Sequence, residues 1–185
     1  LWKTAQTKSI PIFMMNFKTP NIMLRTFQLR VARSVTGIEI REVALYLGIS
    51  RTIISRWENQ PIFDSIKTKK VSPESLVFFF KQHGILFPSE DSVKFTSQLK
   101  SVNSIHLTRF QLRAARAALG LTQDELATLT NSSRAIINYL EIQNNETLLN
   151  TTNKNIDDLI FKSFFQSRGL SFPDNFTICY TSKTI

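Results

Sequence analysis

The sequence has little of the chemistry that most enzyme sites need. Its 185 residues include one cysteine, two histidines and five glycines. A single cysteine, Cys179, excludes an internal disulfide and a cysteine-based zinc cluster. His83 and His106 stand in no metal-ligand spacing, and the sequence has no glycine-rich phosphate loop. We therefore expect no enzyme, no metal and no cofactor, and we find no sign of a small-molecule site.

Long apolar runs are also missing from the sequence. The most apolar stretch near its start, residues 10–17, is interrupted by Pro11 and Asn16 and has no clear signal-peptide cleavage site. We expect no membrane partner. The low cysteine content suits a reducing compartment, so we expect a cytoplasmic location.

Acidic residues are scarce relative to basic ones. The chain has 23 Lys and Arg against 14 Asp and Glu, a formal net charge of +9. The excess lies in the first half, since residues 1–26 carry four cations and no acid, whereas residues 109–180 carry seven of each. Such a charge favours attraction to a polyanion such as nucleic acid.

An internal repeat organises the chain. Phe27-Gln28-Leu29-Arg30 recurs 83 residues later as Phe110-Gln111-Leu112-Arg113, and the same offset then holds for more than thirty residues. Residues 84–88 recur as 169–173, at an offset of 85. These offsets predict a basic N-terminal segment (1–20), a first copy (21–95), a linker (96–108), a second copy (109–180) and a tail (181–185).

Local signals predict helices joined by a sharp turn in each copy. Gly120 suits the end of a helix, and Thr122-Gln123-Asp124-Glu125 has the form of a capping box that starts the next one. Gly48 and Asn131 occupy equivalent positions, and both residue types tolerate positive φ, so a tight turn is expected there. Another helix is expected to start at Pro73, and short hairpins at residues 85–95 and 170–180.

Residues 113–127, Arg-Ala-Ala-Arg-Ala-Ala-Leu-Gly-Leu-Thr-Gln-Asp-Glu-Leu-Ala, resemble repressors of the XRE/Cro/C1 family. The resemblance implies a mainly α fold of two lambda-repressor-like helix-turn-helix domains in tandem, each ending in a short β-hairpin. It also implies double-stranded DNA as the partner and a nucleoid-associated location in a prokaryotic cytoplasm.

The resemblance assigns base reading to the start of the third helix of each copy, which enters the major groove in this family. Arginine bonds guanine edges and asparagine bonds adenine edges, so the residue types suit the role. The candidate base-reading residues are Arg51, Thr52, Ser55 and Arg56 in the first copy, and Arg134, Ala135, Asn138 and Tyr139 in the second.

The family also implies a phosphate contact at the start of the second helix, where the second copy has Thr122 and Gln123. The first copy departs from this pattern, because Glu39 and Ile40 occupy those positions. Its phosphate contacts are then expected from the basic N-terminal segment and from Arg41, Lys67, Lys69 and Lys70.

Two further sets of residues have structural interpretations. Arg33 with Glu58, and Arg116 with Glu141, match a family ion pair between the first and third helices, and we expect them to hold the third helix in place. We expect most of the aromatic cluster to lie in the core, with one Phe of each copy facing the other copy or a second chain. This cluster contains Phe78, Phe79, Phe80, Phe164 and Phe165.

Two functions remain open from the sequence. In the first, the copies form a pseudo-dimer that regulates transcription from an imperfect palindrome, since their candidate readers differ. In the second, the chain is a protein-interaction module, antitoxin-like or antirepressor-like, that keeps the fold with weak or one-sided DNA binding. The C-terminal helix and hairpin of each copy also offer a surface for self-association.

Overall fold

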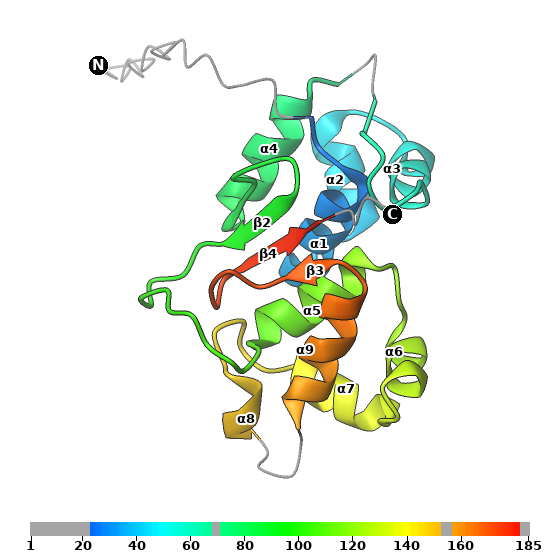
Figure 1. The fold of residues 1–185 in the computed structure, drawn as a ribbon. Coiled ribbons are helices and arrows are strands. Elements are labelled where there is room, and N and C mark those ends of the chain that lie inside the picture. The colour runs from blue at the N-terminus through cyan, green and yellow to red at the C-terminus, as the bar shows by residue number, and fades with distance from the viewer. Residues whose placement is uncertain (1–22, 68–70, 153–156, 182–185) are drawn as a thin grey trace, which may run out of the picture.

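The computed structural model describes residues 23–67, 71–152 and 157–181. The basic segment 1–20 and residues 182–185 of the tail lie outside this part of the chain. The described chain is mainly helical with a small antiparallel sheet of four strands, which confirms the expectation of a mainly α protein (Figure 1).

Apart from one extra short helix in the second copy, both copies follow the same order of elements. The first copy contains α1 (Thr26–Thr36), α2 (Ile40–Leu47), α3 (Arg51–Glu58), α4 (Pro73–Gln82), β1 (Ile85–Leu86) and β2 (Ser92–Phe95). The second copy contains α5 (Arg109–Ala118), α6 (Gln123–Leu129), α7 (Arg134–Glu141), α8 (Leu149–Thr152), α9 (Asp158–Ser167), β3 (Leu170–Ser171) and β4 (Thr177–Tyr180). The short helix α8 was not expected from the sequence.

The turns lie where the sequence predicts them. Gly48 has a φ of 64° and Asn131 a φ of 51°, so both copies turn through the left-handed region between the second and third helices. Gly120 follows the end of α5 with a φ of 69°. The Thr122 hydroxyl accepts a hydrogen bond from the Glu125 amide at 3.1 Å, which starts α6 as the capping box predicts.

The two expected hairpins are present, and they join into one sheet with the order β1-β2-β4-β3. Val93 of β2 lies opposite Ile178 of β4, its own equivalent in the second copy. Matching backbone bonds flank this pair: the Phe95 amide donates to Phe176 O and the Tyr180 amide to Asp91 O, both at 2.8 Å. The two copies therefore meet through a pairing with two-fold character.

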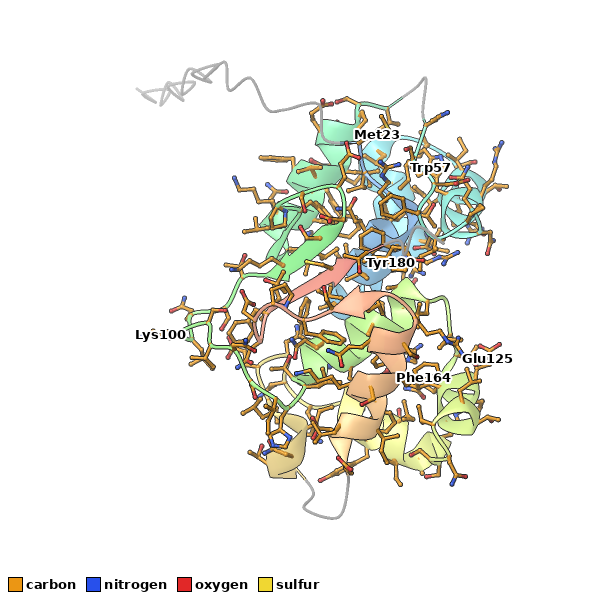
Figure 2. All side chains as sticks on the ribbon, viewed as in Figure 1. Met23, Trp57, Lys100, Glu125, Phe164 and Tyr180 are labelled. Carbon is orange, nitrogen blue, oxygen red and sulfur yellow. The ribbon has the colours of Figure 1, made fainter. Side chains whose placement is uncertain are left out.

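Helices α1 and α5 form the second part of this junction, since each contacts the other. Ala114, Ala115 and Ala118 are fully buried on α5, and these short side chains allow α1 to approach closely. Phe27 on α1 packs on Tyr180 with ring centroids 5.8 Å apart, and Phe110 on α5 packs equivalently on Phe95 at 5.7 Å. Figure 2 shows Tyr180 between the two halves of the molecule.

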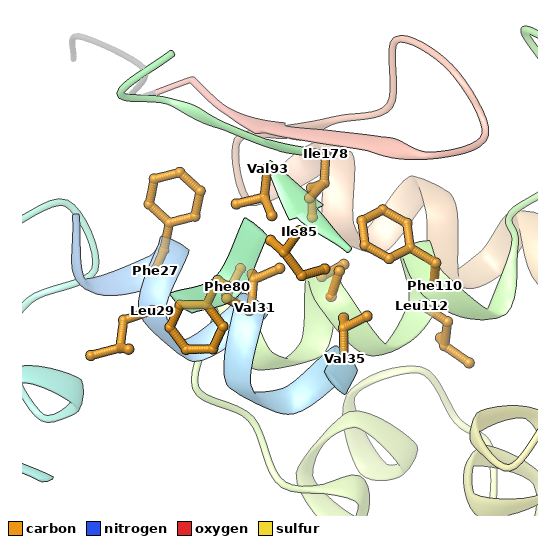
Figure 3. Close-up of a cluster of buried hydrophobic side chains, with 14 of the residues drawn as sticks. Phe27, Leu29, Val31, Val35, Phe80, Ile85, Val93, Phe110, Leu112 and Ile178 are labelled. Carbon is orange, nitrogen blue, oxygen red and sulfur yellow. The ribbon is translucent and has the colours of Figure 1, made fainter. Parts of the chain in front are cut away.

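Buried apolar side chains of both copies belong to one continuous cluster, beneath the sheet and between the helices (Figure 3). Phe79, Phe80 and Phe165 are buried, so most of the aromatic cluster lies in the core as expected. Phe78 is exposed on α4 and Phe164 is half-buried.

The segment between the copies, residues 96–107, is described throughout and contains neither helix nor strand. It is fastened to α9, because the Lys162 ammonium donates to Ser104 O and Ile105 O, each at 2.9 Å. Across the described ranges, none of the helices has the length and apolar character needed to cross a bilayer.

Candidate nucleic-acid interface

The predicted base-reading residues lie on the solvent side of α3 and α7. Arg51, Thr52, Arg56, Arg134, Ala135, Asn138 and Tyr139 are exposed, and Ser55 is half-buried. The opposite faces are buried: Ile54 and Trp57 point inward from α3, and Ile137 and Leu140 from α7. Each helix thus presents one polar face to solvent and anchors itself by the other.

An ion pair between the first and third helices fixes the position of each of these faces. Arg33 Nε lies 2.6 Å from Glu58 Oε1, and its Nη2 donates to Glu58 Oε2 at 2.8 Å. Arg116 makes the same bidentate contact with Glu141, with Nε 2.5 Å from Oε1 and Nη2 2.7 Å from Oε2. The structure brings together both pairs that the sequence singled out. Such bidentate bonds between ionised groups constrain direction as well as distance.

The same arginines reach the start of the second helix in each copy. Arg33 Nη1 donates to Ile38 O at 3.2 Å, and Arg116 Nη1 donates to the equivalent Leu121 O at 2.7 Å. One guanidinium therefore joins the first helix, the turn before the second helix and the end of the third. The orientation of α3 or α7 relative to the first two helices of its copy therefore depends on this arginine side chain.

The first copy has an open cleft of about 560 Å³ between the start of α2 and the outer face of α3. Arg41, Arg51, Thr52 and Ser55 line it together with Arg33, Glu39 and Ile40. Within the described ranges, neither Arg41 nor Arg51 takes part in an ion pair, so both are free to meet an anion. Lys67 is exposed, and Lys69 and Lys70 lie outside the described residues.

The corresponding surface of the second copy is arranged differently. Thr122 is engaged in the capping box, where its amide donates to Glu125 Oε2 at 2.7 Å. These bonds from Thr122 lower the pKa of the Glu125 carboxyl group. Gln123 donates to Glu141 Oε2 at 2.9 Å and thus supports the ion pair. Arg134 Nη1 lies 3.4 Å from Asp124 Oδ2, and both side chains are exposed. Figure 2 shows Glu125 on the outer side of α6.

Arg109 supports the second copy but was missed in the sequence analysis. It is buried, and its Nε donates to Glu141 O at 2.7 Å. Burial and the nearby Arg113 lower the pKa of Arg109 to about 10, so it is still a cation at neutral pH. The first copy has Thr26 at this position, whose hydroxyl donates to Trp57 O at 3.2 Å. Because the residue type changes between the copies, the repeat gave no signal for it.

A contact between a histidine and a carboxylate lies away from α3 and α7. His106 Nδ1 is 2.8 Å from Asp158 Oδ1, and Asp158 Oδ2 accepts a bond from the Leu107 amide at 2.7 Å. Asp158 is buried at the start of α9. Both of its carboxylate oxygens bind groups of the segment that precedes α5, so this contact fastens that segment to α9. His83 lies at the end of α4, with Nδ1 2.8 Å from Phe79 O.

No set of three or more histidine, cysteine or carboxylate side chains in the described part of the chain is arranged to hold a metal ion. The chain matches no protein-family model, no curated protein and no solved structure.

Proposed function

We propose that this protein is a sequence-specific regulator that binds double-stranded DNA. In this proposal α2–α3 and α6–α7 are two helix-turn-helix units of one chain, and α3 and α7 enter the major groove at two half-sites about one helical turn, or roughly 34 Å, apart. The two units act as a pseudo-dimer on an imperfect palindrome.

The observation that carries the proposal is the equivalence of two exposed polar helix faces, each fixed by the same arginine–glutamate pair. A DNA-reading helix needs such fixation, because base contacts depend on direction. The two-fold pairing at Val93 and Ile178 adds support, since related faces suit the related half-sites of a palindrome. The positive net charge supplies attraction to phosphate.

The different readers of the two copies predict different half-sites. Arg51 and Arg56 favour guanine edges in one half-site, whereas Asn138 favours an adenine edge in the other. Each well-placed bidentate contact discriminates against the wrong base by about 1 to 3 kcal/mol.

The proposal is tested by selecting binding sites from random duplex DNA at two salt concentrations. Wild type is compared with Arg51→Ala/Arg56→Ala and with Arg134→Ala/Asn138→Ala. We expect each double variant to lose one distinct half-site and to keep the other. Lys81→Ala/Lys100→Ala is the control, because it removes two exposed cations outside α3 and α7; Figure 2 shows Lys100 at the far edge of the molecule.

If no sequence is enriched and residual binding disappears at high salt, the charge attracts DNA only generically and the proposal is wrong. Loss of the same half-site in both double variants would also contradict it. The control should keep both half-sites and change binding to every sequence about equally, since any general charge attraction that it removes carries no base information.

A protein-interaction module is the second candidate function. Two observations favour it. Asp124 pairs with Arg134, one of the predicted base-reading residues. Leu45 on α2 is 82% exposed and offers an apolar side chain to a partner. Salt dependence separates the two functions. Binding to phosphates falls steeply with ionic strength, whereas association through an apolar surface need not.

A further inference from the structure

The starting point is a charge reversal at one equivalent position of the two copies. Arg41, in the first turn of α2, corresponds to Asp124 in the first turn of α6. Between residues 39–58 and their equivalents 122–141, no other position exchanges a basic for an acidic residue. This reversal of sign lies beside α3 in the first copy and beside α7 in the second.

The reversal changes what happens to the first residue of the third helix. This residue is arginine in both copies, Arg51 and Arg134. In the first copy Arg51 lines the cleft together with Arg41, and Glu39 is the only acid among the described residues that line it. In the second copy Arg134 faces Asp124 at 3.4 Å, with side chains 68% and 66% exposed.

The surrounding charges add to this difference. The two arginine–glutamate pairs are left out of this count. The remaining charges of α2, α3 and the residues before them are Arg41, Arg51 and Arg56 against Glu39 and Glu42, whereas those of α6 and α7 are Arg134 against Asp124 and Glu125. The first unit is thus net positive and the second net negative. A DNA phosphate that approaches the start of α2 meets the Arg41 guanidinium, whereas at the equivalent position of α6 it meets the Asp124 carboxylate.

We propose that Asp124 makes the grip on DNA unequal: the α2–α3 unit supplies most of the phosphate binding, and Asp124 weakens the grip of the α6–α7 unit by repelling phosphate and by holding Arg134. This inference rests on the proposed function and names the residue that regulates its second half. The α6–α7 unit reads its half-site only when the first unit already holds the DNA close.

The physical scale of the effect is moderate. An exposed ion pair such as Asp124–Arg134 is itself weak, so DNA can displace it. Removing the carboxylate frees Arg134 and ends the repulsion, and we expect affinity to rise about three- to tenfold at moderate salt. A new phosphate contact also steepens the slope of log affinity against log salt by about 0.9.

The experiment measures the affinity for the selected operator over a range of salt concentrations. Asp124→Asn removes the carboxylate without adding a charge, and Asp124→Arg copies the first unit. Glu74→Gln is the matched control, because Glu74 is also an exposed acid in the first turn of a helix, α4. Figure 1 shows α2 between α4 and α3, so Glu74 lies away from the predicted reading helix. Arg41→Asp makes the reverse change in the first unit.

We expect Asp124→Asn to tighten binding three- to tenfold and Glu74→Gln to change it less than about twofold. Asp124→Arg should steepen the salt slope by about one, and Arg41→Asp should flatten it by about one. If Asp124→Asn has no more effect than Glu74→Gln, or if it weakens binding because Asp124 orients Arg134 toward a base, the inference is overturned. Wild-type protein that selects no sequence instead overturns the proposed function itself.

Discussion

The two arginine–glutamate pairs differ in how completely their carboxylates are enclosed. Glu141 is 5% exposed and receives bonds from Arg116 and Gln123, whereas Glu58 is 12% exposed and has Ile40 where Gln123 stands. Removing one partner of an enclosed pair leaves the other charge without compensation. The second pair should therefore be the more costly one to break.

We expect Glu141→Ala to lower the free energy of unfolding by about 3 to 5 kcal/mol, because it leaves the half-buried Arg116 guanidinium without its bidentate partner and removes a carboxylate charge near the buried Arg109. Glu58→Ala should cost less. Chemical denaturation followed by circular dichroism measures both values. Asp64→Ala, at an exposed carboxylate, is the control and should change stability by less than about 0.5 kcal/mol. A Glu141→Ala variant as stable as this control would show that the pair does not support the fold.

Among single residues, the contacts that could be predicted from the sequence are those of residues that recur in both copies. Arg33, Glu58, Arg116 and Glu141 keep both identity and spacing, so the repeat itself pointed to them. The partners of Gln123 and Arg134 could not be predicted in the same way. Both side chains are predicted to meet DNA, and the structure adds contacts with Glu141 and Asp124 that depend on how α6 and α7 pack together.

At the scale of elements, the glycines that follow helices differ in how much space surrounds them. Gly48 ends α2 with a φ of 64°, and a Cβ added there would meet nothing within 4 Å. Gly169 follows α9 with a φ of 86°, and a Cβ there would lie 2.7 Å from Thr181 O. The Thr181 amide donates to Gly169 O at 2.8 Å, so this approach closes the β3–β4 hairpin.

We expect Gly48→Ala to destabilise the protein by about 1 to 2 kcal/mol, which is the cost of the left-handed conformation alone. Gly169→Ala bears the same cost and must also push β4 away, so its loss of stability should be clearly larger. Thermal unfolding of the two variants in parallel makes the comparison. Equal melting temperatures would mean that the hairpin yields easily and that its close approach is unimportant.

Helix ends and turns were predictable because they depend on residues close in sequence. The capping box at Thr122, the turns at Gly48 and Asn131 and the start of α4 at Pro73 were each expected before the structure. The pairing of β2 with β4 was not expected, because it joins segments 85 residues apart and shows no sequence signal beyond two short apolar strands. Helix α8 was missed because four residues carry no helical periodicity.

At the scale of the whole molecule, the junction between the copies occupies surfaces that a dimer would otherwise use. The C-terminal helix and hairpin of each copy were expected from the sequence to offer a surface for self-association. In the structure the hairpins pair with each other inside one chain, and α1 packs on α5. The strands left at the edges, β1 and β3, have two residues each and offer little backbone for pairing with another chain.

This arrangement predicts one chain per operator. A separate-chain dimer loses affinity on dilution as its subunits dissociate, whereas the covalent link between the copies keeps both units together at any concentration. We expect a 1:1 complex and a hyperbolic binding curve in titrations with the selected operator, and free protein that sediments as a monomer of 21.2 kDa. Sedimentation of a labelled duplex with increasing protein gives the stoichiometry directly. A 2:1 complex with sigmoidal binding would mean that each chain engages only one half-site, and that the shared sheet serves stability rather than DNA recognition.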